Sequence, residues 1–296
     1  VYGDSDGLPG LVIDRFDQVI VVQVSNAGIE LLLEQLLLAI NEVVPGLNIL
    51  LKNDGKMRAI EGLEDYVRVA QGEVPKLVPL KENGVSFLAP VWDGQKTGWF
   101  YDHRLNRRRV QKLSDGKRVL DMFSYIGGWG VQAAAAGAKE VICVDASAQA
   151  LDLVHQQAEL NGVGDKVHSV KGDAFNAMKQ LHEDGERFDI VIIDPPAFIA
   201  RRKDIKAGEL AYQRANQLAM RLLNPEGILV SASCSMHLER VRLTQLLLES
   251  CRQNGRMGQV FEHAGHGGDH PAHPPIQETD YSTSFFLHPQ NRTQTL

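Results

Sequence analysis

The chain contains three cysteines, and the segment "ILVSASCSMHLER" at residues 228–240 places one of them where an apolar stretch gives way to a polar loop. A structural thiol favours the middle of a core element, whereas a reactive thiol needs an accessible position such as a strand end. Cys234 occupies such an end, while Cys143 lies inside the apolar run "VICVDAS" and Cys251 lies late in a predicted helix. Cys234 is therefore the candidate nucleophile, and its alternative interpretation is a small strand-end residue without chemistry. Cys143 is expected in the core.

A glycine-rich turn and an acid follow two consecutive apolar stretches. The first stretch runs into "DMFSYIGGWG" at residues 121–130, where glycines let the backbone approach a ligand closely and the following helix presents free N–H groups. The second ends at Asp145, and an acid at that place can accept hydrogen bonds from both hydroxyls of a ribose. Its alternative role is to cap the next helix, which Ser147 could also do. Together the two motifs predict a nucleoside cofactor.

Two further apolar stretches end in an acid. "VKGDAF" places Asp173 at the end of the third stretch, where a carboxylate can bind an adenine amino group. "IVIIDPPAF" ends the fourth in Asp194, and the two prolines that follow stop the strand and fix a stiff loop at the sheet edge. A substrate base is expected at this loop. The alternative is that Asp194 only stabilises a turn.

These residues must be positioned by an α/β sheet. After about residue 100, apolar stretches alternate with segments of helical length, which predicts a parallel sheet covered on both faces: "KRVLDMF", "KEVICVDAS", "DKVHSVKGD", "FDIVIIDPP" and "GILVSASCS". Ligands of such sheets bind beyond the carboxyl ends of the strands. Residues 1–95 instead contain short strand-like stretches around one helix that ends before Pro45. We expect a small α+β domain at 1–95 and the larger α/β domain at 96–296.

The composition is that of an ordinary globular protein, with 44% hydrophobic and 23% charged residues among 296. No apolar run approaches the ~18 residues of a membrane-spanning helix, so no membrane partner is expected. Three cysteines do not form a disulfide framework, which predicts a reduced, cytoplasmic setting. None of them belongs to a C-x-x-C pair, so no metal site is expected. The net charge of -6 argues against a generally basic nucleic-acid coat but permits a local basic face, because binding follows the distribution of charge.

Two basic runs stand beside the motifs. "RLNRRRVQK" occupies residues 104–112, and "RRKDIK" at residues 201–206 follows the loop at which a substrate base is expected. Charge runs are usually solvated faces, so that interpretation stays open for both. The place of the second run favours contacts of Arg201, Arg202 and Lys203 with phosphate groups.

The set formed by the G-G-x-G turn, Asp145, Asp173 and "DPPAF" resembles the class I S-adenosylmethionine-dependent methyltransferases, which implies a Rossmann-like sheet and S-adenosyl-L-methionine as cofactor. "GQKTGWFYDHRLNRR" resembles the "QKTG-x-x-x-D-Q-R-x-N-R" signature of a ribosomal RNA methyltransferase group, although His103 stands where that group has Gln. With "LPGLVIDRF", "SCS" and "DHPAHPPIQETDY", almost the whole chain is similar to the large-subunit (23S) ribosomal RNA cytosine-5 methyltransferases. That family carries an N-terminal PUA RNA-binding domain, which we do not find in this sequence.

The resemblance implies roles for three groups of residues. The expected cofactor contacts are Asp102, Asp121, Phe123, Ser124, Gly127, Gly128, Asp145, Ala146, Asp173, Ala174 and Asp194. The expected substrate contacts are Pro195, Pro196, Phe198, Arg201, Arg202 and Lys203. Cys234 and Asp194 are the expected catalytic residues. The expected partner is 23S ribosomal RNA; the target nucleotide, a homodimer and the base that removes the carbon 5 proton are left open.

The implied reaction proceeds through a covalent adduct. Carbon 5 of cytosine is not nucleophilic, and a thiolate that adds to carbon 6 makes it so. A helix expected directly after Cys234 would favour the thiolate at its N-terminus, and Asp194 would hydrogen-bond the cytosine edge. Many RNA cytosine-5 methyltransferases with a second cysteine have it in the fourth-strand motif. This chain has Pro195 and Pro196 there, so the Cys234 thiol would serve alone.

Three alternatives stay open at this point. A guanine-N7 ribosomal RNA methyltransferase shares the "QKTG" and "DPP-x-F" features but needs no cysteine. An amino-group methyltransferase has an aromatic residue directly after Asp/Asn-Pro-Pro, whereas here Ala197 intervenes before Phe198. A non-catalytic RNA-binding relative would have no need of an intact set of cofactor acids.

Overall fold

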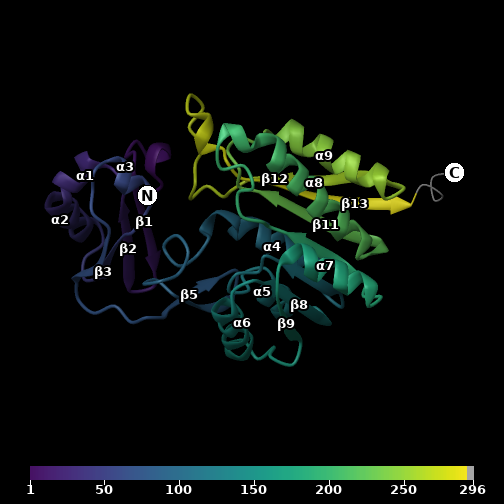
Figure 1. Cartoon of the computed structure of the whole chain (residues 1–296). Helices are drawn as coiled ribbons and strands as arrows, with labels where there is room; N and C mark the ends of the chain where they lie inside the picture. The colour runs from purple at the N-terminus through teal and green to yellow at the C-terminus, as the bar shows by residue number, and fades with distance from the viewer. Residues whose placement is uncertain (292–296) are drawn as a thin grey trace. The chain divides into compact units, whose positions relative to one another are not determined.

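The computed structural model of this chain describes residues 1–291 and is drawn in Figure 1. Its strands are β1 (Leu11–Phe16), β2 (Val19–Val24), β3 (Asn48–Asn53), β4 (Tyr66–Gln71), β5 (Val78–Glu82), β6 (Val85–Ala89), β7 (Arg118–Met122), β8 (Glu140–Asp145), β9 (Val167–Lys171), β10 (Phe188–Ile193), β11 (Leu223–Ser233), β12 (Arg256–Ala264) and β13 (Thr283–Asn291). Its α-helices are α1 (Ala27–Leu31), α2 (Leu33–Val43), α3 (Met57–Ile60), α4 (Arg104–Leu113), α5 (Gly130–Ala135), α6 (Ala148–Leu160), α7 (Ala174–Glu183), α8 (Ile205–Arg221) and α9 (Arg240–Gln253). Short 3-10 helices are η1 (Gly3–Asp6), η2 (Tyr101–His103), η3 (Arg202–Asp204) and η4 (Gln277–Thr279).

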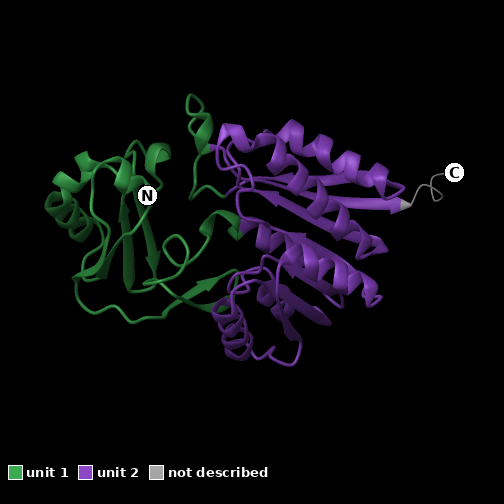
Figure 2. Cartoon of the chain, in the orientation of Figure 1, with its two compact units in different colours: residues 1–104, 267–279 green, residues 105–266, 280–296 purple. Residues whose placement is uncertain are grey.

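The chain divides into two units, which Figure 2 colours separately. The N-terminal unit consists of residues 1–104 and 267–279, and the C-terminal unit of residues 105–266 and 280–296. The sequence instead predicts a single division after residue 95. The segment at residues 267–279 is polar, and nothing in its local sequence indicates that it packs with the N-terminal unit. In the structure the ring of His270 lies 4.6 Å from that of Tyr2, and Asp269 pairs with Arg104 at 3.2 Å.

The N-terminal unit contains a four-stranded sheet in the order β1-β2-β3-β4. β2 and β3 are parallel and are connected through α1 and α2, whereas the other neighbouring strands are antiparallel. Apolar side chains alternate with period two along the strands and pack with the helices into one core, formed by Leu11, Ile20, Val22, Val24, Ile40, Leu47, Ile49 and Leu51. β5 and β6 form a separate antiparallel hairpin.

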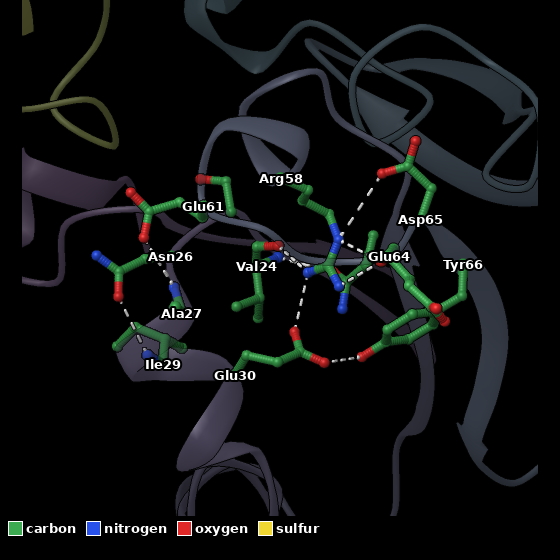
Figure 3. A network of polar contacts seen from close by, with 12 residues as sticks. Val24, Asn26, Ala27, Ile29, Glu30, Arg58, Glu61, Glu64, Asp65 and Tyr66 are labelled. Atoms are coloured by element: carbon green, nitrogen blue, oxygen red, sulfur yellow. Dashed lines mark hydrogen bonds and ion pairs between the residues drawn. The ribbon is translucent and has the colours of Figure 1, made fainter.

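A buried arginine holds the helices of this unit to its sheet, as Figure 3 shows. Arg58 of α3 is only 2% exposed and donates to the carbonyl oxygens of Val24 and Glu64, both at 2.6 Å. It also donates to the Glu30 carboxylate at 2.9 Å, and the Tyr66 hydroxyl donates to the same carboxylate at 2.7 Å. Burial opposes ionisation of Glu30, but the hydrogen bonds from Arg58 and Tyr66 prevail and lower its pKa. The guanidinium is therefore fully paired inside the unit.

The C-terminal unit is built on a seven-stranded sheet in the order β12-β13-β11-β10-β7-β8-β9. Neighbouring strands from β7 to β11 are parallel, whereas β13 is antiparallel to both β11 and β12. The strand order reverses between β7 and β10, and ligands of such sheets bind at that reversal, beyond the carboxyl ends. The predicted α/β sheet is confirmed.

Helices cover both faces of this sheet (Figure 1). Leu120 and Met122 of β7 belong to an apolar core that they share with α7, α8 and α9. The alternate positions Asp121 and Cys143 point to the other face, where Asp121 contacts Gly130 at the start of α5. α8 and α9 lie side by side over β10 to β12.

Most predicted elements of this unit are present, and two additional strands are found. The five predicted parallel strands correspond to β7 to β11. β12 and β13 lack a long apolar run, and their pairing depends on β11, which lies far along the chain from either. In the N-terminal unit, the helix predicted before Pro45 is divided at Leu32 into α1 and α2.

None of the helices within residues 1–291 combines the length and the apolar character that a membrane crossing requires.

Candidate functional site

The loop after β7 has an unusual backbone. Phe123, Tyr125 and Gly127 have φ values of 61°, 49° and 83°. Positive φ is costly for residues with a side chain, and such strained positions cluster at ligand-binding sites. The turn is fixed by hydrogen bonds from Ser124 N to Val144 O at 3.0 Å and from Gly127 N to Ser124 O at 2.8 Å. This glycine-rich loop, residues 123–129, therefore has one defined shape at the carboxyl end of β7.

Asp121 lies beneath this loop and is fully buried. Its Oδ2 accepts a hydrogen bond from Gly130 N at 2.8 Å and lies 4.0 Å from Cys143 Sγ. Burial raises the pKa of Asp121 to about 8, and the negative charges of Asp194 and Asp145 act in the same direction, against the Gly130 bond. The side chain predicted to contact the cofactor thus turns inward, is protonated at neutral pH and holds the start of α5.

Gly130 allows α5 to approach the sheet closely. A Cβ atom at this residue would lie 2.6 Å from Cys143 Sγ, which is too short for a carbon contact, and 3.1 Å from Asp121 Oδ2, which is tight. Cys143 itself has no exposed surface, and burial raises the pKa of its thiol well above the ordinary value. The prediction that Cys143 belongs to the core is confirmed.

Asp145 stands at the carboxyl end of β8 and is half-buried. Its Oδ2 accepts from Tyr125 N in the glycine-rich loop and its Oδ1 accepts from Ser147 N, each at 2.9 Å. The capping of α6 falls to Ser147, whose Oγ accepts from Ala150 N at 3.2 Å. Because a carboxylate oxygen can accept more than one hydrogen bond, Asp145 is oriented by the loop and keeps capacity for hydroxyl groups.

The end of β9 supplies Asp173, which is exposed. Its Oδ1 accepts from Asn176 N at 3.0 Å and caps α7, of which Ala174 is the buried first residue. Ala146, next to Asp145, is exposed. Because β7, β8 and β9 are parallel neighbours, the loop and both acids lie along one edge of the sheet.

Asp194 follows β10, on the other side of β7. Its Oδ2 accepts a hydrogen bond from Trp129 Nε1 at 2.9 Å, and Trp129 is 3% exposed at the end of the glycine-rich loop. This contact joins the glycine-rich loop to the substrate loop, which we define as residues 194–199. Trp129 stands inside the quoted motif "GGWG", yet its indole partner could not be inferred from the sequence.

Cys234 lies beside the substrate loop, with Sγ 3.8 Å from Pro195 O, and is half-buried. The expectation of a helix directly after it is wrong, because a turn closed by Leu238 N and Ser235 O intervenes and α9 begins only at Arg240. The turn residues "SMHLE" do not continue the helical pattern of α9. The thiol is therefore next to a carbonyl oxygen of the substrate loop and not at a helix N-terminus.

Phe198 is the aromatic residue of the substrate loop, and its ring is largely occupied by neighbours. Ring centroids of Phe123 and Phe175 lie 6.1 Å away, and that of Tyr212 lies 4.9 Å away. Pro196, by contrast, is exposed. Phe198 thus packs beneath the loop and supports it, whereas the side chain of Pro196 faces solvent.

Structural contacts engage most of the first basic run. Arg107 is buried, Arg104 pairs with Asp269, and Arg109 pairs with Glu262. Such pairs could not be inferred from the sequence because the partners lie more than a hundred residues away.

The second basic run is exposed at Arg201, Arg202 and Lys203. Arg201 pairs with Asp204 at 3.0 Å, a surface contact of the kind that contributes little. The run follows the substrate loop and leads into α8.

Asp102 belongs to the N-terminal unit, where its carboxylate pairs with Lys96 Nζ at 2.8 Å. In the same unit, Thr97 Oγ1 donates to the Asp14 carboxylate at 2.6 Å and thereby joins the "QKTG" and "LPGLVIDRF" motifs. The assignment of Asp102 to the cofactor stays a prediction.

Comparison with known proteins identifies related sequences. A family model described as S-adenosylmethionine-dependent methyltransferase matches residues 64–261. The chain is 37% identical over 286 residues to the ribosomal RNA large subunit methyltransferase I of Aeromonas salmonicida, covering 96% of this chain and 71% of that protein. It is 36% identical over 287 residues to the protein of the same name from Erwinia tasmaniensis, covering 96% and 72%.

Solved structures share the fold at lower identity. A putative S-adenosylmethionine-dependent methyltransferase from Streptococcus mutans matches with a TM-score of 0.85 and 21% identity, over 97% of this chain and 73% of that one. A putative methyltransferase solved in complex with S-adenosylhomocysteine (SAH) matches equally well, at a TM-score of 0.85 and 21% identity over 97% and 74%.

Replacing Asp121 by Asn should make the fold more stable at high pH. The folded-state pKa of about 8 lies above the ordinary value of 3.8, so the wild type loses stability as the pH rises from about 4 to about 8. An amide can keep the Gly130 bond and has no proton to lose. One pKa unit corresponds to about 1.4 kcal/mol. The variant should therefore match the wild type near pH 4 and exceed its free energy of unfolding by several kcal/mol, at most about 6, at pH 9, as measured by urea unfolding. The control Asp165→Asn, at an exposed carboxylate, should show the same pH dependence of the free energy of unfolding as the wild type. If Asp121→Asn also shows the wild-type pH dependence, the raised pKa of Asp121 is contradicted.

Proposed function

The chain belongs to the S-adenosylmethionine-dependent methyltransferases, and we propose that it methylates carbon 5 of a cytosine in large-subunit (23S) ribosomal RNA. The observation that carries this proposal is the accessible thiol beside the substrate loop, with Cys234 Sγ 3.8 Å from Pro195 O. The name of the relatives at 36–37% identity supports ribosomal RNA of the large subunit as the substrate. The thiol supports the choice of carbon 5 among the positions of a base.

The edge of the sheet fits S-adenosylmethionine, which supplies an electrophilic methyl group when bound. The half-buried Asp145 carboxylate is held by two backbone amides and can accept the ribose hydroxyls. Asp173 is exposed at the next strand end and is assigned to the adenine amino group. The glycine-rich loop offers close backbone approach at Gly127 and Gly128. Asp194 adds a further carboxylate, which suits a ligand with a positively charged sulfur.

The chain's own residues activate the base. The Cys234 thiolate adds to carbon 6 and forms a carbon–sulfur bond, and the electron pair of the 5,6 double bond becomes available at carbon 5. Asp194 hydrogen-bonds the cytosine edge and is kept in place by the Trp129 indole. After methylation a base removes the proton from carbon 5, the double bond reforms, and the carbon–sulfur bond breaks to return the thiolate. Pro195 and Pro196 keep the substrate loop stiff during these steps.

A guanine-N7 methyltransferase is the second candidate, because the substrate loop suits it equally. That reaction needs no thiol, since the ring nitrogen is itself nucleophilic. It would leave the position of Cys234 beside the loop without a chemical role.

Replacing Cys234 by Ala should abolish both methylation and covalent trapping. RNA that contains 5-fluorocytidine should form a stable adduct with the wild type, because fluorine blocks the proton loss that releases the enzyme. Without the nucleophile, carbon 5 stays unactivated, and the methylation rate should fall roughly 1,000-fold or more while cofactor affinity survives. Gel shift of the adduct and mass mapping of ribosomal RNA would measure the two effects.

The control for this experiment is Cys143→Ala. It should cost roughly 1 kcal/mol or more of stability through a small core void and leave trapping intact. Near-normal methylation by Cys234→Ala would overturn the cytosine-5 proposal and favour guanine N7.

Replacing Asp145 by Ala should weaken the cofactor complex without unfolding the protein. Hydrogen bonds from two hydroxyls to a carboxylate are worth about 1–3 kcal/mol, which corresponds to a roughly 10- to 100-fold increase in Kd. Titration calorimetry with S-adenosylhomocysteine measures this Kd, and Asp152→Ala on the exposed face of α6 serves as the control. An unchanged affinity would contradict the assignment of Asp145 to the cofactor site.

Neutralising Arg201, Arg202 and Lys203 together should weaken RNA binding and reduce its salt dependence. Each lost phosphate contact lowers the slope of log K against log salt by about 0.7, so the slope should drop by roughly 2. Filter binding across a range of salt concentrations gives this slope. A matched control removes Lys117, Lys139 and Lys166, which precede β7, β8 and β9 at the opposite edge of the sheet. Equal slopes for the wild type and the first triple variant would make the run a solvated face.

A further inference from the structure

The two serines that flank Cys234 are bonded to the same atom. Ser233 Oγ donates to the Tyr212 hydroxyl at 3.0 Å, and Ser235 Oγ lies 2.8 Å from that hydroxyl. Ser235 N also donates to Ser233 Oγ at 3.2 Å. Both serines and Tyr212 are buried, whereas Cys234 between them is half-buried. The segment that carries the thiol is thus held on both sides by one tyrosine.

The same tyrosine reaches the substrate loop. The rings of Tyr212 and Phe198 meet edge to face at 4.9 Å. Ile199 N donates to Ser235 Oγ at 3.2 Å, which ties the loop directly to the cysteine segment. Tyr212 therefore joins the loop of Asp194, which its ring contacts, to the segment of Cys234, which its hydroxyl bonds.

α8 can deliver this tyrosine because Gly208 lies one turn before it. Residues four apart share a helix face, so Gly208 and Tyr212 both point to the substrate loop. A Cβ atom at Gly208 would lie 2.3 Å from Ile199 Cγ1 and 2.8 Å from Phe198 O. The glycine lets the helix lie against the loop, and the tyrosine then bridges from the loop to the cysteine segment.

We propose that Tyr212 is a positioning residue that clamps the Cys234 segment to the substrate loop and so sets the distance between the thiol and Asp194. This inference rests on the proposed function, in which those two groups act on one base. The 3.8 Å contact of Cys234 Sγ with Pro195 O is the spacing that the clamp maintains. Reacting groups must be held within about an ångström of the productive geometry, because a displacement of that size costs roughly 100-fold in rate.

A hydroxyl group is needed at this place. A tyrosine hydroxyl donates one hydrogen bond and accepts two, so it can accept from Ser233 Oγ and at the same time share a hydrogen bond with Ser235 Oγ. Burial raises the pKa of Tyr212 to about 12, so the group stays protonated over the whole working range. A phenylalanine would leave the buried serine hydroxyls short of a partner.

The test is Tyr212→Phe, measured by the rate of covalent trapping on 5-fluorocytidine RNA and by the affinities for RNA and S-adenosylhomocysteine. The trapping rate should fall roughly 10- to 100-fold, while both affinities change by less than about twofold. Alkylation by iodoacetamide gives an independent signal, because Cys143 and Cys251 are buried and Cys234 is the half-exposed thiol. A released segment should be alkylated several-fold faster than the wild type.

A second variant, Ser233→Ala with Ser235→Ala, keeps the aromatic ring in the core and tests the clamp if Tyr212→Phe does not fold. The triple variant combines this pair of substitutions with Tyr212→Phe. Its trapping rate should stay within about twofold of the rate of the slower parent variant, since all three side chains act through one network. Tyr66→Phe is the matched control: it removes a hydroxyl bonded to Glu30 in the N-terminal unit and should lower stability without changing either rate.

Wild-type rates of trapping and alkylation in Tyr212→Phe would overturn the clamp while leaving the proposed function in place. A loss of thermal stability with both rates unchanged would overturn it equally, because a purely structural tyrosine predicts that result. If the wild type itself forms no adduct, the proposed function fails, and the alkylation rates alone decide whether the clamp exists.

Discussion

The close approach of α5 to the sheet is the constraint on which the site depends. Gly130 lies so close to Cys143 that a side chain on residue 130 would collide with Sγ, and the Asp121 carboxyl accepts a hydrogen bond from the Gly130 amide at 2.8 Å. With the start of the helix fixed there, the glycine-rich loop has to turn within a few residues, and it does so through positive φ at Phe123 and Tyr125. The strained turn is therefore a consequence of helix packing on the sheet.

From this point a series of contacts leads across the strand ends. Trp129, at the end of the glycine-rich loop, donates to Asp194 of the substrate loop. That loop packs on Tyr212 through Phe198, and Tyr212 bonds the serines beside Cys234. Groups separated by a hundred residues in the sequence thus share one connected scaffold. Burial beneath it raises the pKa of Asp121, and the negative charges of Asp194 and Asp145 add to this effect.

The apolar runs of the sequence predict the five parallel strands, and the acids at their ends predict where ligands bind, because both follow from local pattern and the direction of parallel strands. Other features depend on distant partners. The burial of Asp121 and the ion pair of Arg109 with Glu262 are examples, since neither side chain carries a local signal of its partner. The sequence did not predict the turn between Cys234 and α9, because "SMHLE" contains no glycine or proline that would indicate a later start of the helix.

The discontinuity of the N-terminal unit has a consequence for synthesis. Its first segment ends at Arg104, but His270 and Asp269, which contact Tyr2 and Arg104, emerge from the ribosome only after the parallel strands of the other unit. Contacts over such a span are slow to form because the intervening chain must close a long loop. The first hundred or so residues can collapse early, but they acquire their complete set of contacts only after residue 279 has been translated. Although it comes first in the chain, the N-terminal unit is therefore completed late in translation.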